Sequence, residues 1–127
     1  EAWGLDHNIR LVRSQFAPGF SADPHMLHEG RNSGFQAVNL AMHFGCAVIV
    51  LVGFDMRHQY GAHFFGDYEK PLRRNTDHSE FVRYFDEAAA LLPKAGTPRI
   101  VNATPNSGVR CFEMMPLEQA LRLEPRA

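Results

Sequence analysis

The chain has 127 residues, 45% hydrophobic and 21% charged, and its net charge is −1 with the histidines neutral. This composition is typical of a globular protein and argues against extensive disorder. The charge balance lacks the basic excess of nucleic-acid-binding proteins. The longest apolar run, Cys46 to Val52, is much shorter than the roughly 20 residues that span a bilayer. We therefore expect one domain, residues 1–127, with no nucleic-acid or membrane partner.

The first half of the chain contains two predicted elements. Residues 9–14 alternate apolar and polar side chains, which is typical of a half-buried or edge strand, and residues 16–30 read as a loop. A largely buried helix is predicted from about Ser33 to Phe44, ending at Gly45. Its polar residues form a narrow stripe, consisting of Gln36, Asn39 and His43.

A continuous apolar run, residues 47–52, predicts a strand that is buried on both faces, as parallel sheets require. Residues 56–77 form a long loop without a period, and such loops are usually functional or disordered. This loop is rich in aromatic residues and histidine, so we expect it to be functional rather than disordered. Asp77 is a predicted N-cap, with Glu80 as its capping-box partner, for a helix that ends near Pro93.

The last third of the chain predicts a short strand over residues 99–103 and a turn over residues 104–108. Pro116 opens a short final helix through Leu121. Strands and helices thus alternate, which predicts an α/β fold: a three-layer Rossmann-like parallel sheet with helices on both faces, in a truncated or minimal form.

In a right-handed parallel arrangement, strand carboxyl ends and helix N-termini meet at one edge of the sheet, where ligands bind. Helix N-termini there offer free N–H groups that suit a phosphate or carboxylate. We expect the residues at these positions to converge. They are Asn32, Ser33, Gly53, Asp55, Asp77, His78, Asn102 and Thr104.

The block Asn32-Ser33-Gly34, its helix and the strand ending in Gly53-Phe54-Asp55 resemble part of the nucleotide-binding domain of Campylobacter-type CMP-sialic-acid sialyltransferases. They are also similar to the motility accessory factor-like domain. The likeness extends over residues 30–121 for small uncharacterised phage and prophage proteins, which share a Gly-Phe-Asp-Met strand end, His63-Phe64-Phe65-Gly66-Asp67 and a third strand ending Val101-Asn102-Ala103-Thr104-Pro105-Asn106-Ser107.

This resemblance implies a nucleotide or nucleotide-sugar donor held by the Asn32-Ser33-Gly34 turn, glycosyl transfer, and a location in the cytoplasm of a bacterial host cell. It implies a histidine base, which is either His63 or His78. The family's glycine-rich nucleotide loop is missing, and Arg57 or His58 replaces its tyrosine. The donor pocket is therefore incomplete or completed by another chain.

Each candidate also has a structural interpretation. His63 near Asp67 is either a base held by a carboxylate or a loop histidine bonded to backbone. Asn32 and Ser33 either bind phosphate or only cap a helix. Asp55 either binds a ribose hydroxyl or caps a turn. The spacing of the histidines and Asp67 is not diagnostic of a metal site, so we predict none.

The candidate catalytic residues are His63, Asp67 and His78, and the candidate ligand-binding residues are Arg31, Asn32, Ser33, Gly34, Gly53, Asp55, Asn102 and Thr104. We expect a phage-associated protein that binds a nucleotide, a nucleotide sugar or a related phosphorylated ligand, as a sialyltransferase-like enzyme or its remnant. The alternative is a non-catalytic Rossmann-like binding or assembly module. It predicts an exposed apolar surface covered by a second subunit, hence a homo-oligomer. The sequence does not decide whether turnover occurs.

Overall fold

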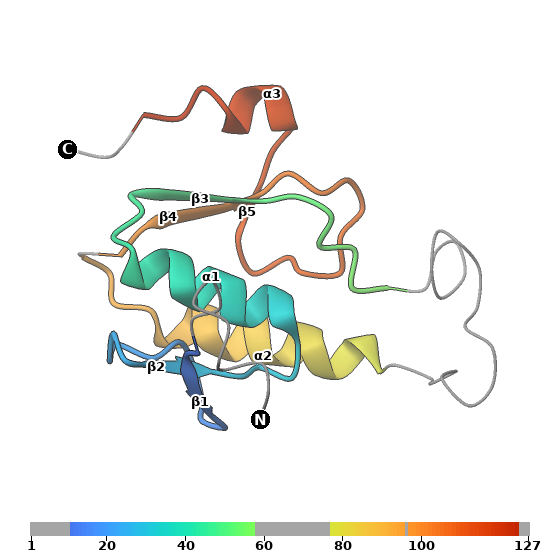
Figure 1. The fold of residues 1–127 in the computed structure, drawn as a ribbon. Coiled ribbons are helices and arrows are strands. Elements are labelled where there is room, and N and C mark those ends of the chain that lie inside the picture. The colour runs from blue at the N-terminus through green and yellow to red at the C-terminus, as the bar shows by residue number, and fades with distance from the viewer. Residues whose placement is uncertain (1–10, 58–76, 96, 125–127) are drawn as a thin grey trace.

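A computed structural model of the chain describes residues 11–57, 77–95 and 97–124, and it is a mixed α/β structure (Figure 1). Within these residues it has five strands and three helices. In chain order they are β1 Arg13–Gln15, β2 Met26–His28, α1 Ser33–His43, β3 Val48–Leu51, α2 His78–Leu91, β4 Arg99–Asn102, β5 Glu113–Met114 and α3 Leu117–Ala120.

The main sheet has the order β3-β4-β5, and both pairs of neighbouring strands are parallel. Leu51 of β3 pairs with Asn102 of β4, so the two strands end side by side. β1 and β2 form a separate parallel pair. The prediction of parallel strands is confirmed, and the strands are divided between two small sheets.

The two faces of the main sheet are covered differently. α1 and α2 both lie on one face, whereas the short α3 lies on the other (Figure 1). Ile49, Leu51 and Ile100 join the larger core, where Phe35 of α1 contacts Phe85 of α2 with ring centroids 5.2 Å apart. The alternate residue Val101 packs with Ala120 of α3 in a smaller cluster. Apolar side chains on both faces explain why the strands read as continuous hydrophobic runs.

Local signals place the ends of both long helices. The Asn32 side chain accepts the backbone N–H of Phe35 at the start of α1, and Gly45, with φ of 73°, follows its end. The Asp77 side chain caps α2 by accepting from the Ser79 N–H. These predicted caps are confirmed. The Glu80 side chain forms ion pairs with Arg31 and Arg83, and no capping-box bond from this side chain back to the Asp77 backbone is found within the described residues.

Two predictions for the first half of the chain need correction. Residues 26–28, expected as loop, form β2, and β1 is shorter and later than the expected strand over residues 9–14, of which residues 9 and 10 lie outside the described residues. β2 contains three residues flanked by irregular backbone, which is too short to show an alternating pattern.

A buried amide holds this region against α1. Asn39, part of the predicted polar stripe, is fully buried, and its Oδ1 accepts the backbone N–H groups of Ser21 at 2.9 Å and His28 at 3.0 Å. Its Nδ2 donates to the Ser21 carbonyl oxygen at 3.0 Å. These bonds satisfy backbone groups that would otherwise be buried without partners. Asn39 therefore has a structural role that binds the segment before β2 to α1.

None of the helices within the described residues is long and apolar enough to cross a membrane.

Candidate functional site

The N-termini of α1 and α2 and the carboxyl ends of β3 and β4 meet at one edge of the main sheet (Figure 1). Arg31, before α1, forms an ion pair of 3.4 Å with Glu80 in the first turn of α2. A Cβ added to Gly34 in α1 would lie 2.9 Å from the ring of Phe54, which follows β3. A Cβ added to Gly108, which follows β4, would lie 3.3 Å from Val82 of α2. The predicted convergence is confirmed for these described segments.

Hydrogen bonds clamp the loop after β3 to the loop after β4. The Phe54 N–H donates to the Thr104 Oγ1 at 3.0 Å, and the Ser107 hydroxyl donates to the Phe54 carbonyl oxygen. The Gly108 N–H donates to the Asp55 carbonyl oxygen at 2.7 Å. The two loops therefore form one unit at the carboxyl edge, rather than two separate flaps.

Asn102 and Thr104 contribute to this clamp through their side chains. Asn102 is fully buried; its Nδ2 donates to the Val109 carbonyl oxygen at 2.8 Å, and its Oδ1 accepts the Thr104 N–H at 2.9 Å. The Thr104 hydroxyl is the acceptor for Phe54. Both residues lie where the sequence predicts, and they shape the edge by holding its backbone.

At the start of α1, the candidates Asn32 and Ser33 differ in whether their side-chain polar groups already have hydrogen-bond partners. Asn32 uses both ends of its amide, accepting from the Phe35 N–H at 2.8 Å and donating to the Gly30 carbonyl oxygen at 2.8 Å. The Ser33 side chain is exposed, and no hydrogen bond of its hydroxyl is found within the described residues. Ser33 is therefore better placed than Asn32 to meet a ligand.

The loop after β3 exposes two more candidates. Gly53 has φ of 77°, and a Cβ added there would have no neighbour within 4 Å, so this stretch of backbone is open. The Asp55 side chain is exposed, and its carboxylate has no hydrogen bond within the described part of the chain. Gly53 and Asp55 therefore border an accessible rim next to the start of α1.

Among the described residues, three non-glycine residues have left-handed backbone, and these three lie in loops at this edge. They are Arg31, with φ of 58°, Met56, with φ of 46°, and Asn106, with φ of 55°. Asn adopts this conformation readily, but for Arg and Met it is strained. Such strain persists only where the surroundings enforce it and is frequent at functional sites.

The start of α2 carries the candidate His78. This residue is half-buried, and its ring lies 6.0 Å from that of Phe81 in the same helix. Next to it, hydrogen bonds from the Ser79 hydroxyl and backbone N–H lower the pKa of Asp77. Asp77 is therefore an anion at neutral pH, close to His78. His63 and Asp67, the other catalytic candidates, lie outside the described residues.

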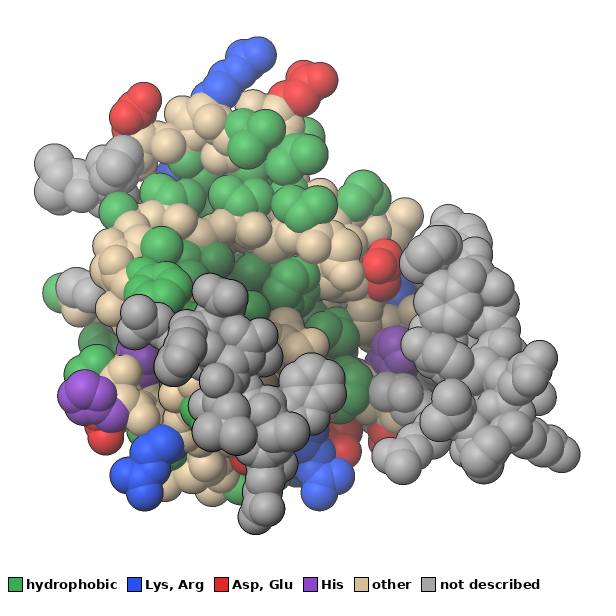
Figure 2. Space-filling view, in the orientation of Figure 1, with side chains coloured by type: hydrophobic (Ala, Val, Ile, Leu, Met, Phe, Trp, Pro, Cys, Tyr) green, Lys and Arg blue, Asp and Glu red, His purple; other side chains and the backbone are tan. Residues whose placement is uncertain are grey.

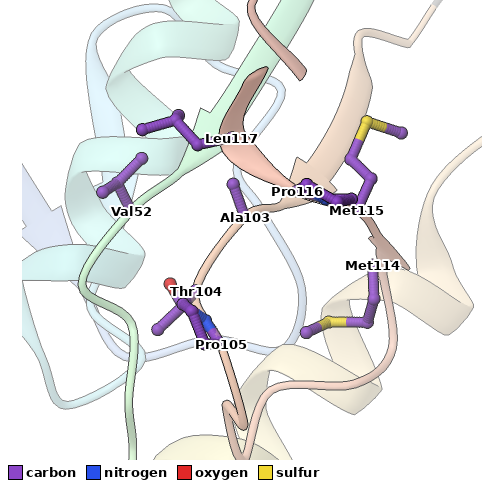
Figure 3. A pocket seen from close by; sticks show the side chains of 8 residues that line it. All are labelled: Val52, Ala103, Thr104, Pro105, Met114, Met115, Pro116 and Leu117. Atoms are coloured by element: carbon purple, nitrogen blue, oxygen red, sulfur yellow. The ribbon is translucent and has the colours of Figure 1, made fainter. Parts of the chain in front are cut away.

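An apolar groove of about 650 Å³ opens on the face of the sheet that carries α3 (Figure 3). Its lining comes from the ends of β3 and β4 and from the β5–α3 connection, namely Val52, Ala103, Thr104, Pro105, Met114, Met115, Pro116 and Leu117. Thr104 belongs both to this groove and to the clamp. Sequence reasoning missed the groove, although the apolar run Met114-Met115-Pro116-Leu117 was a signal for it.

Comparison with protein-family models, with curated proteins and with solved structures finds no match to this chain.

Proposed function

We propose that the carboxyl edge of the main sheet binds a small phosphorylated ligand, of the nucleotide or nucleotide-sugar class. The observation that carries this proposal is the exposed Ser33 at the start of α1, between Arg31 and the contact of Gly34 with Phe54. A helix N-terminus provides N–H donors and a positive dipole end for an anion. Parallel sheets usually bind their ligands at this edge.

The ligand's phosphate would lie at the first turn of α1, accepting from the backbone N–H groups of Ser33 and Gly34 and from the Ser33 hydroxyl. Arg31 would supply positive charge from beside the turn. Because its guanidinium already contacts Glu80 at 3.4 Å, a phosphate must compete with that carboxylate. The exposed Asp55 carboxylate would accept a sugar hydroxyl at the other end of the rim.

The resemblance to sialyltransferase-like proteins extends this proposal to a reduced Rossmann-like domain and to glycosyl transfer. The parallel order β3-β4-β5, with helices on both faces, supports the fold. In glycosyl transfer, a histidine would take the proton of an acceptor hydroxyl. His78, at the start of α2 beside the anionic Asp77, is a candidate within the described residues, and His63 is the other candidate.

The test is calorimetric titration of the intact chain with CMP, UDP and their sugar conjugates. Ser33→Ala and Asp55→Ala each remove one polar contact. Each should therefore raise the dissociation constant of a confirmed ligand by about tenfold, a typical loss for a hydrogen bond to a charged group. Glu80→Gln should strengthen binding several-fold, because it releases Arg31. Glu87→Ala, in the second half of α2, is the control away from the edge and should leave the affinity unchanged.

Two results would contradict the proposal. One is the absence of binding by every nucleotide and nucleotide sugar. The other is a confirmed ligand whose affinity does not respond to Ser33→Ala, Asp55→Ala or Glu80→Gln. The Glu80→Gln variant is informative because a mutation that merely damages the fold would not improve binding.

A second candidate function is a non-catalytic binding or assembly module. The apolar groove favours it, since its walls are almost entirely hydrocarbon and offer a nucleotide phosphate no positive charge. The clamp also engages Asn102 and Thr104, two of the polar candidates. Failure of the nucleotide panel, together with a stable assembly, would favour this function.

A further inference from the structure

We propose that two copies of this chain associate through the α3 face, defined as Val52, Met114, Leu117, Leu121 and the groove between them. This inference does not depend on the proposed ligand. In the space-filling view, hydrophobic side chains gather over β3 and around α3 (Figure 2). The four named side chains have exposed fractions of 57%, 43%, 42% and 72%. A cluster of this kind beside a hollow marks an interaction site more often than scattered single residues do.

The inner side of α3 is already occupied by its own chain. Ala120 is only 2% exposed and packs against Val101 of β4. Leu117 and Leu121 are four residues apart, hence neighbours on the helix surface, and both remain exposed. α3 therefore contributes a pair of leucines that its own chain does not cover.

The charges beside these leucines favour a second copy as the occupant. Glu118 and Arg122 are also four residues apart and exposed, and neither forms an ion pair within the described residues. Around a two-fold axis, two antiparallel α3 helices would place Glu118 of each copy beside Arg122 of the other, with Leu117 beside Leu121. A two-fold interface must be self-complementary in this way. A surface with balanced charge gives no comparable preference for a strongly acidic or basic partner.

The groove supplies area that α3 alone lacks. A stable dimer usually buries about 800 Å² on each subunit, which is more than a single helical turn provides. Val52 and Met114 border the groove next to α3, and methionine adapts its shape to a facing surface. The partner's Leu121, which would lie beside Leu117 at the wall of the groove, would enter the groove and remove both apolar surfaces from water.

Sedimentation equilibrium of the intact chain, over micromolar to hundred-micromolar concentrations, tests the proposal. The wild-type chain should be dimeric, and Leu121→Glu should raise the dissociation constant at least tenfold. Leu91→Glu is the matched control, because Leu91 is similarly exposed, at 59%, but lies on α2 at the opposite face of the sheet. It should leave the dissociation constant unchanged.

A charge exchange tests the antiparallel arrangement. Glu118→Arg or Arg122→Glu alone brings like charges together twice per dimer, so each should weaken association several-fold. The double variant Glu118→Arg/Arg122→Glu should have a dissociation constant within about threefold of the wild-type value, because the two ion pairs form again with their charges exchanged. A monomeric wild-type chain, a dimer insensitive to Leu121→Glu, or a double variant as weak as the worse single variant would each overturn the proposal.

Discussion

Gly30 lies immediately before the strained Arg31, and replacing it with alanine tests the packing beneath the candidate site. Its φ is 51°, and an added Cβ would lie 2.2, 2.4 and 2.6 Å from three ring carbons of Phe35. Phe35 is 1% exposed, and its ring stacks on Phe20 with centroids 4.5 Å apart and contacts Phe85 at 5.2 Å. The ring therefore has no free space into which it can retreat.

The expected cost of Gly30→Ala has two parts. Left-handed backbone costs a non-glycine residue about 1–2 kcal/mol, and forcing extra atoms into a packed core costs about 1–3 kcal/mol. To reach ordinary contact at 3.4 Å from 2.2 Å, the Phe35 ring must move by about 1 Å. We expect a loss of about 2–5 kcal/mol, a large part of the 5–15 kcal/mol typical of a domain.

Urea unfolding followed by circular dichroism measures this loss, with Gly45→Ala as the matched control. Gly45 has φ of 73° but no atom within 4 Å of an added Cβ, so it reports the backbone term alone. The difference between the two variants isolates the contact with Phe35. If Gly30→Ala destabilises the chain no more than Gly45→Ala does, the close approach of Gly30 to Phe35 is wrong.

Two further predictions concern a buried amide and the two thiols. Asn39→Ala leaves the backbone N–H groups of Ser21 and His28 without their acceptor and should cost about 2–4 kcal/mol in urea unfolding. Gln36→Ala, one turn earlier on α1, should cost less than about 1 kcal/mol, and equal losses would contradict the role of Asn39. Burial and the nearby Asp86 carboxylate raise the pKa of Cys111 to about 12, whereas Cys46 is exposed. In Ellman's assay at pH 8, one thiol should therefore react quickly and the other at least about tenfold more slowly, because the thiolate is the nucleophile and the greater nucleophilicity of a thiolate with a high pKa only partly offsets its lower population. A fast reaction of the remaining thiol in Cys46→Ser would refute this.

Near the candidate site, the sequence identified the segments better than it identified the roles of their side chains. Asn102 and Thr104 do lie at the end of β4, as predicted. Their hydrogen bonds to the Val109 carbonyl oxygen and the Phe54 N–H join segments that the sequence gives no means of pairing. The ion pair between Arg31 and Glu80 joins residues 49 positions apart and is likewise invisible in any local pattern.

The sequence by itself determined where α1 and α2 begin and that β3 and β4 are buried and parallel. Caps and hydrophobic periods act over three or four residues, so Asn32 and Asp77 mark the helix starts without any tertiary contact. Only the tertiary structure decided that β2 pairs outside the main sheet, that Asn39 is buried, and that the α3 face stays uncovered. These features depend on which distant segments meet, because burial and partner choice arise from packing between elements rather than from the preferences of single residues.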